Sequence, residues 1–192
     1  SALLCTVFVP IAIRLSWRLG SLDKPGGHKG HHSPVPYLGG VAIVLAFSIA
    51  VLLESTIRPS PGVTNELRVI LGTAAAMAIV GLFDDLLSLS PWPRLVAEVG
   101  SGLMVWNLGV GVGLTGVTWV DLALTVFWVV GITNAFNLLD NMDGLAAGMV
   151  LIACTAYFAI AAANSQFLVA GLSAGLAGCA AGFLRKNRYP AH

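Results

Sequence analysis

The sequence predicts an all-α protein, a polytopic transmembrane helical bundle with about seven spans. Of its 192 residues, 57% are hydrophobic and only 10% are charged, and the mean hydropathy is +0.86. A soluble domain carries about 25% charged residues. Apolar runs also recur at the length of about 20 residues that a helix needs to cross a bilayer. Turn-forming residues separate these runs, so we expect one transmembrane domain over residues 1–192.

Seven apolar runs are predicted to be the spanning helices, and they cover residues 2–19, 38–57, 67–83, 94–108, 119–139, 146–163 and 166–184. The fourth is the weakest, because it is short and contains Glu98. The chain begins with Ser1 and shows no cleavable signal, so the first run is predicted to be a span that has lost its true start. Gly109 to Thr118 alternates Gly with Val, which predicts a short hairpin or a flexible loop.

Charge and cysteine usage exclude several function classes. The net charge is +1, so the chain has no basic field to hold nucleic acid. Cys5, Cys154 and Cys179 each lie alone in an apolar stretch, without the spacing of metal ligands.

The basic residues orient the predicted bundle. Cytoplasmic loops carry an excess of Lys and Arg. Of the ten Lys and Arg residues, only Arg58 and Arg68 fall on one side of the membrane. The other side is therefore predicted to be cytoplasmic, and it collects Arg14, Arg18, Lys24, Lys29, Arg94, Arg185, Lys186 and Arg188.

Two acidic clusters fall on this cytoplasmic side, Asp84–Asp85 after the third run and Asp140 with Asp143 after the fifth. Acids at the C-terminal end of a helix face the negative end of its dipole, which costs about 0.3–1 kcal/mol each. A Mg²⁺ ion would relieve this cost, since Mg²⁺ favours one or two carboxylates plus substrate phosphates. The alternative for the first cluster is a solvated acid pair just beyond the helix end.

Asn134 and Asn137 are three residues apart and share a helix face, and Asp140 continues this stripe if the helix persists. The alternative is end-capping of the sixth helix by Asp140 or Asn141, with Gly144 as a turn residue.

The first linker is a basic, glycine-rich loop in which Lys29 and His31 are candidates to hold phosphate. It could instead be a plain juxtamembrane loop that binds anionic lipid headgroups. A zinc site from His28, His31 and His32 is conceivable, but the usual fourth ligand is missing.

Three motifs resemble those of the polyprenyl-phosphate N-acetylhexosamine-1-phosphate transferases, glycosyltransferase family 4. Asp23-Lys-Pro-Gly-Gly-His28-Lys29-Gly-His31 opens the first, and Gly81-Leu-Phe-Asp84-Asp85, followed by Arg94, is similar to the paired-aspartate motif. The third is Asn134-Ala-Phe-Asn137-Leu-Leu-Asp140-Asn-Met-Asp143-Gly144. The family fold has ten or eleven spans, so the resemblance implies a fragment truncated at its C-terminal end, where a later aspartate and a basic loop would follow. The fragment alone is then expected to be inactive.

The resemblance implies a Mg²⁺-dependent enzyme, with Mn²⁺ as an alternative ion. It would transfer N-acetylhexosamine 1-phosphate from a UDP-sugar to polyprenyl (undecaprenyl) phosphate, the first membrane step of cell-envelope polysaccharide synthesis such as lipopolysaccharide or teichoic acid. Asp84 and Asp85 would be catalytic. Substrate binding would fall to Lys29, His31, Arg94, Asn134, Asn137, Asp140 and Asp143, and metal binding to Asp84, Asp85, Asp140 and Asp143. The first two acids should then lie within reach of the last two.

The same resemblance implies a multi-pass protein of the bacterial cytoplasmic membrane with a cytosolic active site, and it leaves a homodimer open. The linker lacks the Thr-Pro-Thr-Met-Gly-Gly form of the muramoyl-pentapeptide branch, which favours the N-acetylglucosamine branch. The sequence departs from the family's usual residues at three positions. It has His28 where Arg is usual, Asn141 where Gly is usual and Glu98 where Gln is common. A transporter or another lipid-phosphate-binding membrane protein is the alternative. An aromatic prenyltransferase and a CDP-alcohol phosphotransferase fit poorly, because their Asp-rich motifs are incomplete here.

Overall fold

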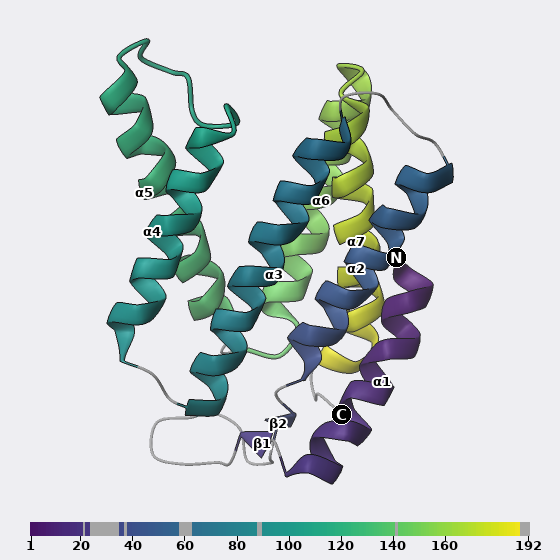
Figure 1. The fold of residues 1–192 in the computed structure, drawn as a ribbon. Coiled ribbons are helices and arrows are strands. Elements are labelled where there is room, and N and C mark those ends of the chain that lie inside the picture. The colour runs from purple at the N-terminus through teal and green to yellow at the C-terminus, as the bar shows by residue number, and fades with distance from the viewer. Residues whose placement is uncertain are drawn as a thin grey trace. The chain divides into compact units, whose positions relative to one another are not determined.

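The computed structural model describes residues 1–20, 22–23, 35–36, 38–57, 63–87, 90–140 and 142–188. This part of the chain contains seven helices and one pair of two-residue strands (Figure 1). The helices are α1 (Ala2–Leu19), α2 (Gly39–Ile57), α3 (Val63–Leu87), α4 (Pro91–Asn107), α5 (Thr118–Leu139), α6 (Leu145–Ala163) and α7 (Phe167–Asn187). The strands β1 (Leu22–Asp23) and β2 (Val35–Pro36) pair antiparallel. The all-α class is therefore confirmed.

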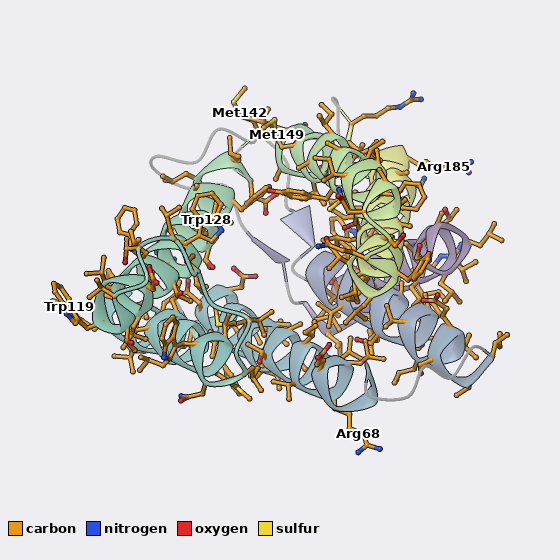
Figure 2. All side chains as sticks on the ribbon, turned by 90° about the horizontal axis from the view of Figure 1, so that it is seen from above. Arg68, Trp119, Trp128, Met142, Met149 and Arg185 are labelled. Carbon is orange, nitrogen blue, oxygen red and sulfur yellow. The ribbon has the colours of Figure 1, made fainter. Side chains whose placement is uncertain are left out.

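Six of the seven helices are long and apolar enough to cross a membrane, and the exception among the described helices is α4 with 17 residues. Large apolar side chains remain exposed along the helices, for example Leu3 at 84% and Phe127 at 73%. Figure 2 shows Trp119 pointing outward from α5, and its exposure is 73%. Such outward apolar surface suits contact with lipid, so the chain is a multi-pass membrane protein.

The helix α3 is longer than the apolar run that predicted it. It continues to Leu87, so Asp84 and Asp85 both lie inside its last turn and a half. The alternative of an acid pair beyond the helix end is therefore wrong. The next helix begins at Pro91, a residue whose fixed φ angle and missing N–H suit the first turn.

The chain divides into two compact units, which are described separately. Unit 1 comprises Ser1–Asn65 and Leu139–His192, and unit 2 comprises Glu66–Leu138. In unit 1, α7 packs against α1, α2 and α6. Small residues form its core: Cys5, Val9, Ala12, Ala42, Ala46 and Cys179. A Cβ atom at Gly182 would lie 2.8 Å from the carbonyl oxygen of Ala2, so only glycine permits this approach of α7 to α1.

Unit 2 contains α4, α5 and most of α3, and its two later helices are in close contact. A Cβ atom at Gly102 of α4 would lie 2.9 Å from the Cα atom of Val126 of α5. The small residue therefore lets the two backbones approach closely.

The loop between α4 and α5 is held by side chains of α5. The Asp121 Oδ1 atom accepts hydrogen bonds from the Thr115 amide and hydroxyl, both at 2.9 Å, and its Oδ2 atom accepts one from the Gly116 amide at 3.2 Å. The Thr125 hydroxyl accepts one from the Val112 amide at 2.8 Å. Residues 108–117 contain no strand. The hairpin alternative is therefore wrong, and this segment is a loop.

Candidate functional site

Three polar side chains of unit 2 meet at one end of its helices. Consecutive helices run in opposite directions, so the C-terminal end of α3, the N-terminal end of α4 and the C-terminal end of α5 face the same way (Figure 1). Asp84, Arg94 and Asn134 lie on these three ends. Three of the predicted site residues are thus brought together within one unit.

The Arg94 guanidinium is the centre of this group. Its Nη1 atom donates to Asp84 Oδ2 at 3.2 Å and its Nη2 atom to Asn134 Oδ1 at 3.4 Å. Its Nε atom lies 3.6 Å from Glu98 Oε1, one helical turn further along α4. The flat guanidinium has three nitrogen atoms that donate hydrogen bonds, and here each nitrogen faces a different side chain.

Glu98 belongs to this group, although the sequence did not predict it as a site residue. Its side chain is 1% exposed, and its Oε2 atom accepts a hydrogen bond from Asn134 Nδ2. The sequence signal was present, since an ionisable residue inside a spanning run is by default a candidate for function. We define the four-residue cluster as Asp84, Arg94, Glu98 and Asn134.

Arg94 supplies part of the positive charge that the sequence argument assigned to a metal ion. Asp84 is 23% exposed and lies near the negative end of the α3 dipole, where a carboxylate is disfavoured. The guanidinium at 3.2 Å offsets this cost. Asp85 follows on the next helix position and is exposed. The structure therefore places two adjacent acidic residues at the end of one helix.

The second acidic motif lies in unit 1. Asp140 is the first residue after α5, so the stripe that begins with Asn134 and the exposed Asn137 leaves the helix there. Gly144 is the N-cap of α6, with a φ angle of 73° and no side-chain cap, so the alternative that Asp140 caps α6 is wrong. As predicted, Gly144 is a turn residue.

Residues far apart in the sequence fix the turn before α6. The Gly144 amide donates to Asn187 Oδ1 at the end of α7, at 3.0 Å. A Cβ atom at position 144 would also lie 3.4 Å from the Asn187 carbonyl oxygen. Asp143 directly precedes this pinned glycine, so the α6–α7 contact determines where the second acidic motif lies within unit 1.

Asp140 is an exposed residue, but neighbouring protein atoms partly desolvate its carboxyl group and so raise its pKa above the ordinary value of aspartate. Removing water disfavours the charged form of an acid. A carboxyl group of this kind holds its proton to a higher pH than a solvated aspartate does.

The contacts described so far do not include the other predicted site residues or the predicted metal site. Lys29 and His31, with the zinc candidates His28 and His32, fall outside the described residues. Within the described ranges, no three His, Cys, Asp or Glu side chains form a group that could hold a metal ion. The adjacent carboxylates of Asp84 and Asp85 match the one or two carboxylates that Mg²⁺ takes from a protein. The approach of the second acidic motif to them stays a prediction, because it lies in the other unit.

Comparison with known proteins adds a family likeness. The model of a family described as "Glycosyl transferase family 4" matches residues 67–192. A protein of Bacillus subtilis (strain 168), named "Probable undecaprenyl-phosphate N-acetylglucosaminyl 1-phosphate transferase", is 31% identical over 100% of this chain and 54% of its own length.

Two phospho-N-acetylmuramoyl-pentapeptide-transferases are also similar. That of Heliobacterium modesticaldum is 31% identical over 95% of this chain and 62% of its own length. That of Limosilactobacillus fermentum is 31% identical over 81% of this chain and 53% of its own length. The chain thus spans between about half and two thirds of the curated relatives that it matches.

Proposed function

The chain belongs to glycosyl transferase family 4, and from this premise we propose that it carries the membrane site of an enzyme that transfers a sugar 1-phosphate from a UDP-sugar to a polyprenyl phosphate. The sugar in this proposal is an N-acetylhexosamine, and specifically N-acetylglucosamine. The enzyme works in a bacterial cytoplasmic membrane, with its site at the cytosolic face, and serves the synthesis of a cell-envelope polysaccharide.

The observation that carries the proposal is the convergence of Asp84, Arg94 and Asn134 from three helices at one end of unit 2. Charged groups inside a membrane protein are expensive and mark functional sites. Here an arginine and a carboxylate lie at a helix end, where a lipid phosphate at the membrane surface can reach them.

The reaction exchanges one phosphoanhydride bond for another, so catalysis consists of positioning two anions and screening their charge. Asp84 or Asp85 takes the proton of the lipid phosphate or orients it, and Arg94 meets a phosphate oxygen. Asn137, Asp140 and Asp143 bind the nucleotide, and Lys29 and His31 meet its phosphates. Direct attack on the UDP-sugar and a phosphoaspartate intermediate are two routes that fit these residues equally.

Mg²⁺ would be held by Asp84 and Asp85, with Asp140 and Asp143 completing its surroundings. Bound there, the ion would screen the negative charge of the two phosphates. The four-residue cluster agrees with this role, because one guanidinium faces the two carboxylates of Asp84 and Glu98 and leaves net negative charge.

N-acetylglucosamine is proposed as the sugar on two grounds. One Bacillus subtilis relative, 31% identical over the whole chain, is named for N-acetylglucosaminyl 1-phosphate transfer. The first linker also lacks the Thr-Pro-Thr-Met-Gly-Gly form of the muramoyl-pentapeptide branch. The rival donor is UDP-N-acetylmuramoyl-pentapeptide, after the names of the other relatives.

A transporter, the non-enzyme alternative, predicts ionisable groups near the middle of spans. Asp84 and Asp85 lie at the end of α3, and Asp140 follows the end of α5. Glu98 does lie near the middle of α4, but it is tied to Arg94 and Asn134. These positions favour the transferase.

The test uses the complete natural protein in lipid nanodiscs, with undecaprenyl phosphate and radiolabelled UDP-N-acetylglucosamine. We expect label to enter the lipid fraction together with release of UMP, and both to stop when EDTA removes Mg²⁺. Asp85→Asn should lower turnover by at least about a hundredfold, because an amide is no base and a poorer Mg²⁺ ligand.

Glu66→Gln is the matched control, because it removes one acidic charge from an exposed residue in the first turn of α3, far from Asp85. Full turnover by Asp85→Asn, or in EDTA, would show that the chemistry lies on other residues. Transfer from UDP-N-acetylmuramoyl-pentapeptide alone would move the protein to the other branch.

A further inference from the structure

The buried carboxylate of Glu98 contacts two polar side chains with its two oxygens. One oxygen accepts a hydrogen bond from Asn134 Nδ2, and the other lies 3.6 Å from Arg94 Nε. The side chain is 1% exposed, and among the described residues Oε1 has no hydrogen-bond partner besides this ion pair. A charge removed from water is costly unless nearby groups compensate it. Glu98 therefore depends on Arg94 and Asn134, and they in turn are held by it.

The contacts among Arg94, Glu98 and Asn134 form a closed ring. Arg94 contacts Glu98, Glu98 accepts from Asn134, and Asn134 accepts from Arg94 Nη2 at 3.4 Å. Asp84 lies outside the ring, and among the described residues it accepts a hydrogen bond from the third guanidinium nitrogen, Arg94 Nη1. The ring thus determines where that donor points.

The carboxylate also determines the orientation of the Asn134 amide. An ionised glutamate can only accept hydrogen bonds, whereas an amide can donate or accept. The NH₂ group of Asn134 must therefore face Glu98, and its oxygen must face Arg94. The Asn134 NH₂ group has a second hydrogen atom, which it donates to the Val130 carbonyl oxygen. The distance from Nδ2 to this oxygen is 2.9 Å, and this contact supports the same orientation.

We propose that Glu98 is a positioning residue of the site, which fixes the Arg94 guanidinium and the Asn134 amide so that the Arg94 Nη1 donor is held at Asp84. The part that concerns turnover rests on the proposed function, whereas the part that concerns Arg94 does not.

Glutamine at position 98 would break the ring of contacts, although its side chain has nearly the same size as that of glutamate. One amide oxygen cannot serve both Arg94 Nε and Asn134 Nδ2, and the amide nitrogen would face another donor. Glu98→Gln should therefore fold normally, because it removes a buried charge without making a cavity, and should release Arg94.

The first readout is the reactivity of Arg94 towards phenylglyoxal, which modifies guanidinium groups, followed by peptide mass spectrometry in the nanodisc-embedded protein. Glu98→Gln should speed modification of Arg94 about tenfold, the factor that corresponds to losing one charge-assisted contact. Arg68, which is exposed and points away from α3 (Figure 2), is the internal reference. Its rate should not change, and Glu66→Gln should leave both rates unchanged.

The second readout is a swap of the two side chains. In Glu98→Gln with Asn134→Asp, the carboxylate at position 134 accepts from both Arg94 and the new amide, and the amide oxygen at position 98 faces Arg94 Nε. The net charge of the cluster is that of the original protein. Modification of Arg94 should return to within about twofold of the original rate, because both contacts of the guanidinium are restored.

Turnover supplies the third readout. Glu98→Gln should lower kcat at least about tenfold at an unchanged melting temperature, because displacement of Arg94 slows the reaction but does not unfold the protein.

Four results would overturn the proposal. They are an unchanged Arg94 rate in Glu98→Gln, equal acceleration at Arg94 and Arg68, a swapped variant as reactive as the single variant, and an unchanged kcat with Arg94 released. Absence of transfer by the unaltered protein would instead refute the proposed function and leave the phenylglyoxal test valid.

Discussion

At the scale of single residues, Arg94 faces two carboxylates, Asp84 at 3.2 Å and Glu98 at 3.6 Å. One positive and two negative charges leave a formal charge of −1 on these three side chains. Lysine could not replace this arginine, because a single ammonium group lacks the planar arrangement that reaches three side chains.

Arg94→Met should destabilise the protein by about 3 kcal/mol, because it leaves the Glu98 carboxylate buried without a counter-charge. The double variant Arg94→Met with Glu98→Met should recover most of this loss, since no buried charge remains. Unfolding in mixed micelles, followed by tryptophan fluorescence, measures both. A double variant no more stable than the single one would contradict this account.

Competition between a proton and a metal ion for Asp140 gives a prediction about the pH dependence of metal binding. Its pKa is raised by burial, so it takes up a proton at a higher pH than an ordinary aspartate as the pH falls. With Asp140 as a ligand of the ion, as proposed, Mn²⁺ binding, measured by electron paramagnetic resonance, should weaken at a higher pH than a solvated aspartate would give. Asp140→Asn, which cannot titrate, should bind Mn²⁺ weakly and without this part of the pH dependence. Identical pH profiles for the two proteins would contradict the role of Asp140.

At the scale of helices, the sequence predicted the elements closely. The runs 2–19 and 119–139 became α1 (Ala2–Leu19) and α5 (Thr118–Leu139). This works because bilayer thickness and backbone hydrogen bonding set the length of a span. The largest error, in α3, arose because polar residues at a helix end remain helical while they lower the local hydropathy.

The contacts between helices could not be predicted in the same way. Helices that are apolar all round offer no preferred face, so the sequence does not show how each is rotated about its axis. Glu98 lies one turn from Arg94, and this spacing could have suggested their contact. Its contact with Asn134 of α5 depends on the rotation of two helices, and the sequence did not reveal it.

The loop between α4 and α5 gives a prediction at this scale. Asp121 accepts hydrogen bonds from several donors of residues 114–116. Asp121→Ala should loosen this loop, at a cost of about 1.5–3 kcal/mol for contacts to a charged acceptor. Hydrogen exchange of the amides of residues 112–116 should then accelerate, while exchange within α4 stays slow. Protection of the loop unchanged by Asp121→Ala would contradict the role of this carboxylate.

At the scale of the whole molecule, the orientation of the chain in the membrane is a prediction from its basic residues. Met142→Cys and Arg185→Cys should resist an impermeant thiol reagent added to intact cells, whereas Leu114→Cys should react. The native cysteines are buried and should contribute little background. Labelling of residue 142 from outside would show that the chain has the opposite orientation in the membrane.

The relation between the two acidic motifs is the second prediction at this scale. A single Mg²⁺ ion with metal–oxygen bonds of about 2.0–2.1 Å requires the carboxylates of Asp84 or Asp85 to approach those of Asp140 or Asp143. Asp85→Cys with Asp143→Cys should therefore be joined by a bismaleimide with a spacer of about 8 Å. Failure to join even with a spacer of about 15 Å would leave no room for a shared ion.

The burial of Glu98 also has a consequence for biogenesis. When α4 emerges from the ribosome it carries Arg94 and Glu98, whereas Asn134 follows later along the chain in α5 and has not yet emerged. A charge near the centre of a helix, as at Glu98, costs about 2.5–3.5 kcal/mol on insertion. With 17 residues, α4 offers little apolar length to offset this cost. We therefore expect the translocon to retain α4 until α5 arrives and to release the two into lipid as a hairpin.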